Sequence, residues 1–327
     1  MAEKSFRPPK VDDELESMSS SSGDVSTVDS PPFRFKSDPP VRNPVIPHSH
    51  QLHMSINVER SIPFADLIYD STKGPAYVKN LPAVIDYSLC MSPASRSAGI
   101  NSLCYAGAAL MEFHTRKRMS AGWIARHRAD LTMRARDVMN ILYEYGCCTE
   151  VSYPSDGSLP DMIYKPKGLY KLTTKPTSDQ LREMKVYQAA AEEANNYLIA
   201  AFAKIKYQLG KSTDNITILQ RSLFENGPAI ITLPVYNFHT QPWVTTSSSN
   251  RVLGGIGMCV VGYNHAGFIL RNCWGPDWGN VGNTLLLYDD FLTRIAWDIY
   301  TLVLDTEHVW DENGKTAKGG RGCCNVS

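Results

Sequence analysis

Helical and strand-forming patterns occupy separate parts of this chain, and this separation limits the choice of fold most. Helical patterns span residues 101–118, 137–145 and 180–206, and in the second of them apolar residues recur at helical spacing up to Gly146. Apolar and β-branched runs, separated by Gly, Pro and Asn, follow at 229–235, 258–263, 268–271 and 283–288. Helices that precede strands predict an α+β protein with two segregated lobes.

The ends of the chain differ in composition from its middle. Serine dominates residues 17–22 and prolines crowd residues 31–47, so residues 1–54 bury too little apolar surface to offset their ordering entropy. We therefore expect an extended or disordered arm, either a free tail or an arm that becomes ordered along a partner. The predicted parts are the arm at 1–54, a lead-in segment at 55–80, a domain at 81–310 and a flexible tail at 311–327.

Charge and cysteine usage exclude several classes of function. Lys+Arg and Asp+Glu both number 33 among 327 residues, so the chain lacks the excess of cations that nucleic-acid binding needs. No run reaches the roughly 18 apolar residues of a membrane span, and no apolar secretory segment is visible. The eight cysteines are therefore expected as free thiols in a reducing compartment, which predicts a cytoplasmic and not a secreted protein. No CxxC pair is present, and we expect no metal site and no cofactor.

Four stretches of the chain carry a recognisable pattern together. They are LPAVIDYS at 81–88, AGINSLCYAGAALMEF at 98–113, GPAIITLPVYNFH at 227–239 and GGIGMCVVGYNHAGFILRNCWGPDWGNVG at 254–282. In this combination the chain resembles the papain-like cysteine peptidases over residues 81–310, and the fourth stretch is the most specific. The resemblance implies a two-lobe fold, with a helical lobe, a β-barrel-like lobe and a cleft between them. This expectation agrees with the α+β class.

The resemblance implies four catalytic positions, of which two are degenerate. The nucleophile position is Cys104, at the start of a helix, and the amide that orients the base is Asn272. The base position holds Ile256, and the position of the oxyanion-stabilising glutamine holds Ala98. A cysteine attacks a peptide as a thiolate held by an imidazolium, and isoleucine has no titratable group. Loss of the base from such a unit costs a factor of roughly 10⁴ to 10⁶ in rate.

Three functional hypotheses follow from this degeneracy. The first, which Ile256 favours, is a catalytically inactive papain-like domain that acts as a structural or binding scaffold, with Cys104 as a small buried hydrophobe. The second is an active cysteine endopeptidase that uses Cys104 with a displaced histidine, His239 or His265. The third is a non-cleaving peptide-binding module, whose cleft floor Ile256 makes more apolar. The expected partners are other proteins, bound through the N-terminal arm and the cleft.

The C-terminal tail carries a lipidation pattern. Its last four residues, from Cys324 to Ser327, fit the C-a-a-X prenylation pattern with a serine that favours farnesyl, and the adjacent Cys323 is a candidate for palmitoylation. Since one lipid chain alone binds a membrane only marginally, the second cysteine and the preceding basic residues would strengthen the attachment. The alternative is a coincidental cysteine pair in a disordered tail. The whole arrangement is similar to papain-like proteins of large cytoplasmic DNA viruses, which implies a virion or minor capsid component near a membrane.

Overall fold

The computed structural model describes residues 55–61, 66–72, 81–128, 132–156, 168–172, 195–207, 214–245, 247, 251–293, 295–304 and 309–311. All of them belong to one unit, Val41–Ser327. The predicted arm at 1–54 and the tail beyond Asp311, with Cys323 and Cys324, lie outside the described residues.

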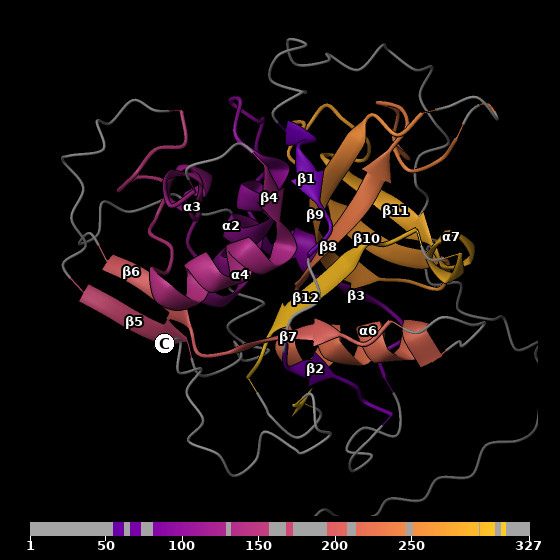
Figure 1. Ribbon diagram of the computed structural model, residues 1–327, viewed down its shortest axis with the longest axis horizontal. Helices are drawn as coiled ribbons and strands as arrows, with labels where there is room; N and C mark the ends of the chain where they lie inside the picture. Colours follow the sequence, from indigo (N-terminus) through magenta and orange to yellow (C-terminus); the bar gives the residue numbers. More distant parts are fainter. Residues whose placement is uncertain are drawn as a thin grey trace, which may run out of the picture. The chain divides into compact units, whose positions relative to one another are not determined.

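The described helices are η1 Tyr87–Cys90, α2 Ser102–Thr115, α3 Ala121–Arg126, α4 Ala135–Glu144, α6 Asp214–Asn226 and α7 Tyr288–Leu292. One of the described helices, α2, is almost entirely buried and lies beside α3 and α4 (Figure 1). Helix α2 begins where the Asn101 side chain accepts a hydrogen bond from Leu103 N, and it ends at Arg116, whose φ is 59°. Every residue from Ser102 to His114 is buried, so α2 is a core helix, and most of its residues are apolar.

The strands form one large sheet and two small ones. Their bounds are β1 Val58–Glu59, β2 Ile68–Tyr69, β3 Ile85–Asp86, β4 Met133–Arg134, β5 Gly168–Leu172, β6 Asn195–Ile199, β7 Phe202–Ile205, β8 Ala229–Val235, β9 Gly254–Tyr263, β10 Gly267–Arg271, β11 Asn283–Leu287, β12 Asp298–Leu302 and β13 Val309–Trp310. The large sheet has nine strands in the order β11-β10-β9-β8-β12-β7-β2-β13, with β3 paired to β9. Strands β1 and β4 form a second sheet, and β5 and β6 a third.

The mixture of helices and sheets confirms the predicted α+β class. The helices α2, α3 and α4 lie together in magenta in Figure 1, and the large sheet lies beside them in orange and yellow. The lobe that the sequence predicts as barrel-like is an open sheet among the described strands, since no described pairing joins β11 to β13. None of the helices in the described part of the chain is long and apolar enough to span a membrane.

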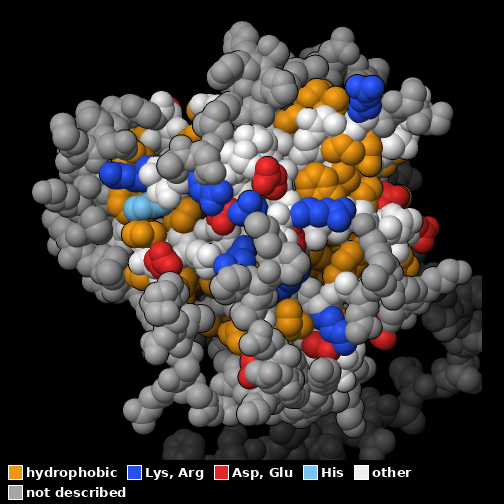
Figure 2. Space-filling model, in the orientation of Figure 1, with side chains coloured by type: hydrophobic (Ala, Val, Ile, Leu, Met, Phe, Trp, Pro, Cys, Tyr) orange, Lys and Arg blue, Asp and Glu red, His pale blue; other side chains and the backbone are white. Residues whose placement is uncertain are grey.

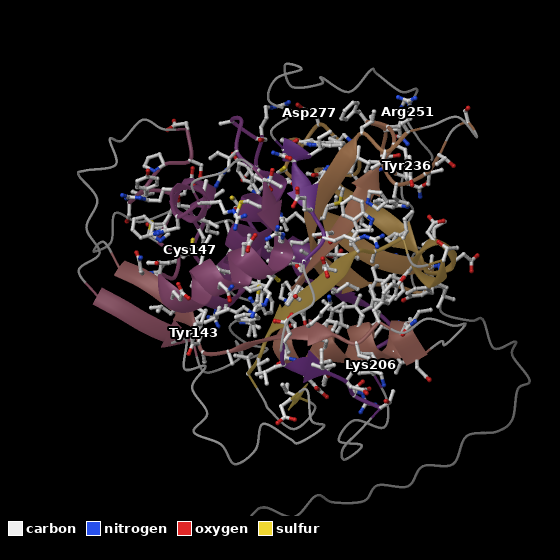
Figure 3. All side chains as sticks on the ribbon, in the orientation of Figure 1. Tyr143, Cys147, Lys206, Tyr236, Arg251 and Asp277 are labelled. Carbon is white, nitrogen blue, oxygen red and sulfur yellow. The ribbon has the colours of Figure 1, made fainter. Side chains whose placement is uncertain are left out.

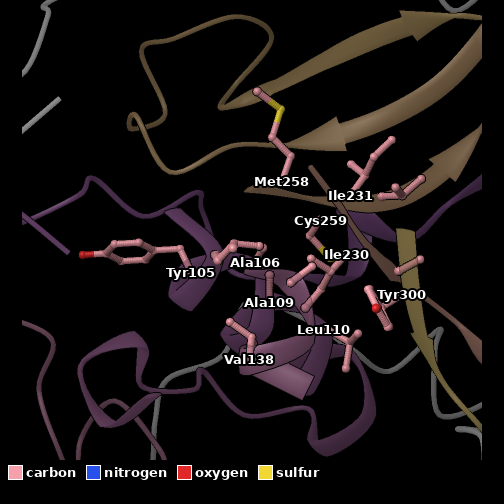
Figure 4. Packing of buried hydrophobic residues seen from close by; sticks show 14 of the residues in the cluster. Tyr105, Ala106, Ala109, Leu110, Val138, Ile230, Ile231, Met258, Cys259 and Tyr300 are labelled. Atoms are coloured by element: carbon pink, nitrogen blue, oxygen red, sulfur yellow. The ribbon is translucent and has the colours of Figure 1, made fainter. Parts of the chain in front are cut away.

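Helix α2 packs directly on strand β9 because β9 carries a glycine at the contact. A Cβ at Gly257 would collide with the Leu103 side chain and come within 3.0 Å of the Leu103 Cα. Gly257 N also donates to Ser102 Oγ at 2.8 Å. Cys259, two residues further along β9, points to the same side, toward Ala109 of α2, whereas Met258 points to the opposite side of the strand (Figure 4). The start of α2 is thereby fixed against the start of β9.

Most of the elements predicted from hydrophobic spacing are confirmed. The helices expected at 101–118 and 137–145 are α2 and α4, and the four expected strand runs are β8 to β11. The prediction of a helix over 180–206 is wrong for the described residues 195–206, which form β6 and β7. The reason is tertiary: β7 pairs with β12 and with β2, so its residues alternate between buried and half-buried sides. Residues 180–194 lie outside the described residues.

The predicted lead-in segment contributes strands to the domain. Its residues Val58–Glu59 form β1, which pairs in parallel with β4, and Ile68–Tyr69 form β2 in the large sheet. Tyr69 is completely buried. We call residues 55–61 the strap, because they contact both the helical part of the molecule and the large sheet. The exact domain boundary near residue 81 remains a prediction.

Candidate functional site

Cys104 is the third residue of α2 and lies inside the protein. Its relative exposure is 0%. Its sulfur lies 3.2 Å from Met133 Sδ of β4, and its backbone N–H donates to Asn101 O at 3.0 Å. Burial raises the pKa of the Cys104 thiol well above its ordinary value, and the nearby Cys273 thiol adds to this rise. The structure thus places the predicted nucleophile in surroundings that favour the neutral thiol, the form that does not attack a peptide.

The predicted base position, Ile256, is the third residue of β9. Its side chain is completely buried, and it pairs with Leu233 of β8 in the antiparallel ladder. Both side chains are hydrocarbons, which have no titratable group and form no hydrogen bonds. The position that would hold an imidazole is therefore part of the apolar core.

The two histidines considered as replacements for the base are both exposed at the surface. His265 follows the far end of β9, and the seven residue-to-residue steps from Ile256 to Tyr263 alone span roughly 23 Å of strand. His239 lies in the loop after β8, where its backbone N–H donates to Asn237 Oδ1 at 2.7 Å. Among the described residues, no histidine makes a hydrogen bond to the Cys104 sulfur. The displaced-base hypothesis therefore has no geometric support.

The predicted oxyanion position, Ala98, also lacks a side chain that could donate a hydrogen bond. Ala98 is exposed, and its backbone N–H donates to Tyr105 Oη at 3.1 Å. The other donor that such a site uses is the backbone N–H of the nucleophile, and in this protein Asn101 O already accepts it. Among the described residues, the backbone N–H groups of Ala98 and Cys104 both already have acceptors, so they form no free pair of donors.

Asn272 follows β10 and is 4% exposed. Its Oδ1 accepts a hydrogen bond from Cys273 N at 2.7 Å, and its backbone N–H donates to Gly282 O at 2.9 Å. Its Nδ2 is buried and has no hydrogen-bond partner within the described part of the chain. Asn272 therefore orients no imidazole, and it stabilises the turn after β10.

The strap crosses the region between the two parts of the molecule, above the start of α2. The carbonyl of Asn57 accepts hydrogen bonds from Asn101 Nδ2 at 2.7 Å and from Met133 N at 3.2 Å, on the helical side. The carbonyl of Ile56 accepts Gly255 N at 2.9 Å, on the side of β9. Next to it, the Ser55 hydroxyl accepts Trp274 Nε1 at 3.2 Å. The strap thus joins the helical part of the molecule to β9 beside the start of α2.

Two glycines of β9 make room for the strap. A Cβ at Gly254 would lie 2.5 Å from the carbonyl oxygen of Ile56, and a Cβ at Gly255 would lie 2.5 Å from that of Val58. Any other residue at either position would have to push the strap away. The pair Gly254-Gly255 was visible in the sequence, but no local pattern shows which segment approaches it.

Ion pairs add to this contact, within the strap at Glu59 and beyond it at Asp66 and Asp70. Arg134 lies 3.5 Å from Glu59, Arg136 lies 2.6 Å from Asp66, and Lys206 lies 2.6 Å from Asp70. In each pair the acid belongs to residues 59–70 and the cation to the remainder of the domain. Lys206 follows β7, in the lower part of the view in Figure 3. Lys and Arg side chains also gather across the middle of the face drawn in Figure 2.

The fold is that of the papain-like cysteine proteases. Xylellain, a cysteine protease from Xylella fastidiosa, has a TM-score of 0.53 at 18% sequence identity, over 76% of this chain and 95% of its own. Procathepsin B S9 from Trypanosoma congolense has a TM-score of 0.48 at 17% identity, over 72% of this chain and 84% of its own. No protein-family model matches the chain, and no curated protein matches it. At such identity the likeness to xylellain shows the fold, and the residues of the site must decide the activity.

Proposed function

We propose that the chain is a catalytically inactive papain-like domain that serves as a structural or binding scaffold. The observation that carries the proposal is the environment of Cys104. Its sulfur is fully buried against Met133, and the residue at the base position is Ile256. A sulfur without an imidazolium and without access to solvent stays protonated at neutral pH.

The alternative of a peptide-binding module is less well supported than the scaffold. An extended peptide needs free backbone groups and an open groove along the two lobes. Here Asn57 and Ile56 already satisfy the donors of Asn101, Met133 and Gly255. A peptide would first have to displace the strap, so we favour partner binding through other surfaces and through the arm.

A peptidase assay with a broad mixture of peptides tests this proposal. The full chain should cleave no peptide faster than the Cys104→Ala variant does. Cys90→Ala, which removes a half-buried thiol of another helix, is the matched control. Cleavage that disappears in Cys104→Ala and persists in Cys90→Ala would overturn the proposal.

The tail gives the proposed scaffold a means of attachment. The C-a-a-X pattern at Cys324, with Cys323 beside it, supports a lipid-anchored protein near a membrane, such as the minor capsid layer of a virion. In a eukaryotic cell supplied with an alkyne-labelled farnesyl precursor, the native chain should take up the label and Cys324→Ser should not. Cys323→Ser should keep the farnesyl label and bind membranes more weakly. An unlabelled native chain found entirely in the soluble fraction would refute this part of the proposal.

A further inference from the structure

A small polar cavity lies beside α2, between this helix, β9 and the turn after β10. Its walls come from α2, from the segment just after it, from β9 and from the turn after β10. Its volume is about 20 Å³. That is enough for one occupant of the size of a water molecule or a small ion, and too little for a peptide side chain or an organic ligand.

Hydrogen-bond donors dominate the lining of this cavity. Asn272 lines it, and the buried Nδ2 of Asn272 has no partner within the described part of the chain. The hydroxyl of Ser102 accepts a hydrogen bond from Gly257 N, and that of Tyr105 accepts one from Ala98 N. Each of these two hydroxyls therefore keeps its own proton for a further acceptor.

The charges that line the cavity are unbalanced. Arg118 and Arg271 contribute two cations, and Glu112 is the one carboxylate among the lining residues. Glu112 Oε1 is already occupied, because it accepts hydrogen bonds from Ser92 N at 2.6 Å and from Ser92 Oγ at 2.7 Å. Glu150 also attracts Arg118 but does not line the cavity.

The state of Arg271 agrees with this imbalance. Its side chain is buried, and one of its terminal nitrogens donates to Ser92 O. Burial lowers the pKa of the Arg271 guanidinium despite the opposing effect of Glu112. A buried cation in this situation is stabilised by a nearby negative charge.

The geometry points to a binding site for one small monovalent anion of the chloride class in this cavity. The ligands would be the Nδ2 donor of Asn272, the hydroxyls of Ser102 and Tyr105, and the positive charge of the two arginines. The volume excludes larger anions, such as phosphate or a carboxylic acid. The site is independent of the proposed scaffold function, since it involves neither Cys104 nor the strap.

Crystals of the full chain grown with sodium bromide test the site directly. The expected result is an anomalous bromine peak in the cavity, within hydrogen-bond distance of Asn272 Nδ2. Thermal unfolding supplies the measurement in solution. At constant ionic strength, replacing gluconate by chloride should raise the unfolding temperature by roughly 3 °C for each tenfold increase in chloride above its dissociation constant. Gluconate is too large for the cavity and serves as the reference anion.

Variants separate this site from a general effect of salt. Asn272→Leu should abolish the chloride-dependent rise in unfolding temperature. Arg118→Gln should abolish this rise as well, and it serves as the test if Asn272→Leu does not fold. Arg96→Gln, which alters an exposed arginine paired with Asp277, should keep the rise. A cavity that contains water only, without a bromine peak, would overturn the inference. Equal unfolding temperatures of the native chain in chloride and gluconate would overturn it as well.

Discussion

The sulfur of Cys104 lies against the thioether of Met133, and this contact determines its chemistry. A thioether is polarisable but carries no charge, so it packs well against a neutral thiol and does little for a thiolate. The motif of the sequence correctly places Cys104 at the start of a helix, and it predicts Ile256 at the position of the base. The scaffold hypothesis expects a buried Cys104, but the motif could not show that Met133 covers it, because Met133 comes from β4 and only tertiary packing joins the two.

At this scale, Cys104→Ala should destabilise the protein only modestly. Removal of one buried sulfur leaves a small cavity beside Met133, and we expect a loss of about 1 kcal/mol in the free energy of unfolding. Urea denaturation measures it. Cys104→Asp, which buries a charge in the same space, should cost at least about 3 kcal/mol. If both variants were as stable as the native chain, the sulfur would not be buried as described.

Gly257 permits the close contact between β9 and α2. Gly257→Ala should cost about 2 kcal/mol, because the new Cβ collides with the Leu103 side chain. Thermal or urea unfolding measures this loss. Val84→Ala, at a side chain that is 52% exposed, is the control and should change stability by less than about 0.5 kcal/mol. An unchanged stability of Gly257→Ala would contradict the described packing.

Among the elements, the strap was the hardest to foresee. Hydrophobic spacing predicts α2, α4 and β8 to β11, because these elements are long enough to show a period. Strands β1 and β2 have two residues each, and they exist only through pairing with β4 and β7. The same cause explains the error at β6 and β7, where sheet pairing overrides a composition that favours a helix.

The glycines that accommodate the strap allow a test at this scale. Gly254→Ala should loosen the strap, since its Cβ would lie 2.5 Å from the Ile56 carbonyl oxygen. We expect residues 55–61 to exchange their amide hydrogens at least about tenfold faster, while the protection of α2 stays the same. Val84→Ala, at an exposed side chain outside the strap, is the control. Equal strap exchange in both variants would refute the contact.

The ion pair between Asp70 and Lys206 predicts a pH dependence. Burial opposes the charge of Asp70, but hydrogen bonds from Lys206 and Thr72 outweigh it and hold the carboxyl pKa below its ordinary value of 3.8. A carboxyl group with a lowered folded-state pKa stabilises the fold above its unfolded-state pKa. This stabilisation is lost as the pH falls through the folded-state pKa.

Limited proteolysis or hydrogen exchange of residues 66–72 measures this effect. Protection should be constant from pH 5 to 7 and should fall below about pH 4. Lys206→Met should lower the protection already at pH 7, whereas Arg96→Gln, at an ion pair away from this segment, should not. Protection of the native chain that rises as the pH falls below 4 would contradict the assignment.

At the scale of the whole molecule, residues 55–61 join the helical part of a papain-like fold to its large sheet. A chain that starts at residue 55 should therefore be as stable as the full chain. A chain that starts at residue 81 loses Ile56, Val58 and Tyr69, all of them buried, and should be less stable by about 5 kcal/mol. Thermal unfolding of the two truncated chains measures this difference in stability. Equal unfolding temperatures of the two chains would show that the strap is dispensable.

The rate at which Cys104 is alkylated, measured against pH and read by peptide mass spectrometry, shows whether the sulfur is a neutral buried thiol or an activated thiolate. A buried thiol without an imidazolium should react slowly, with an apparent pKa above the ordinary thiol value of about 8.5. Unfolding the protein in urea should restore a rapid reaction and an ordinary pKa. Rapid alkylation of the native chain with an apparent pKa below about 6 would reveal a thiolate paired with a cation. That result would contradict the inactive scaffold, and His239 and His265 would be the first residues to replace.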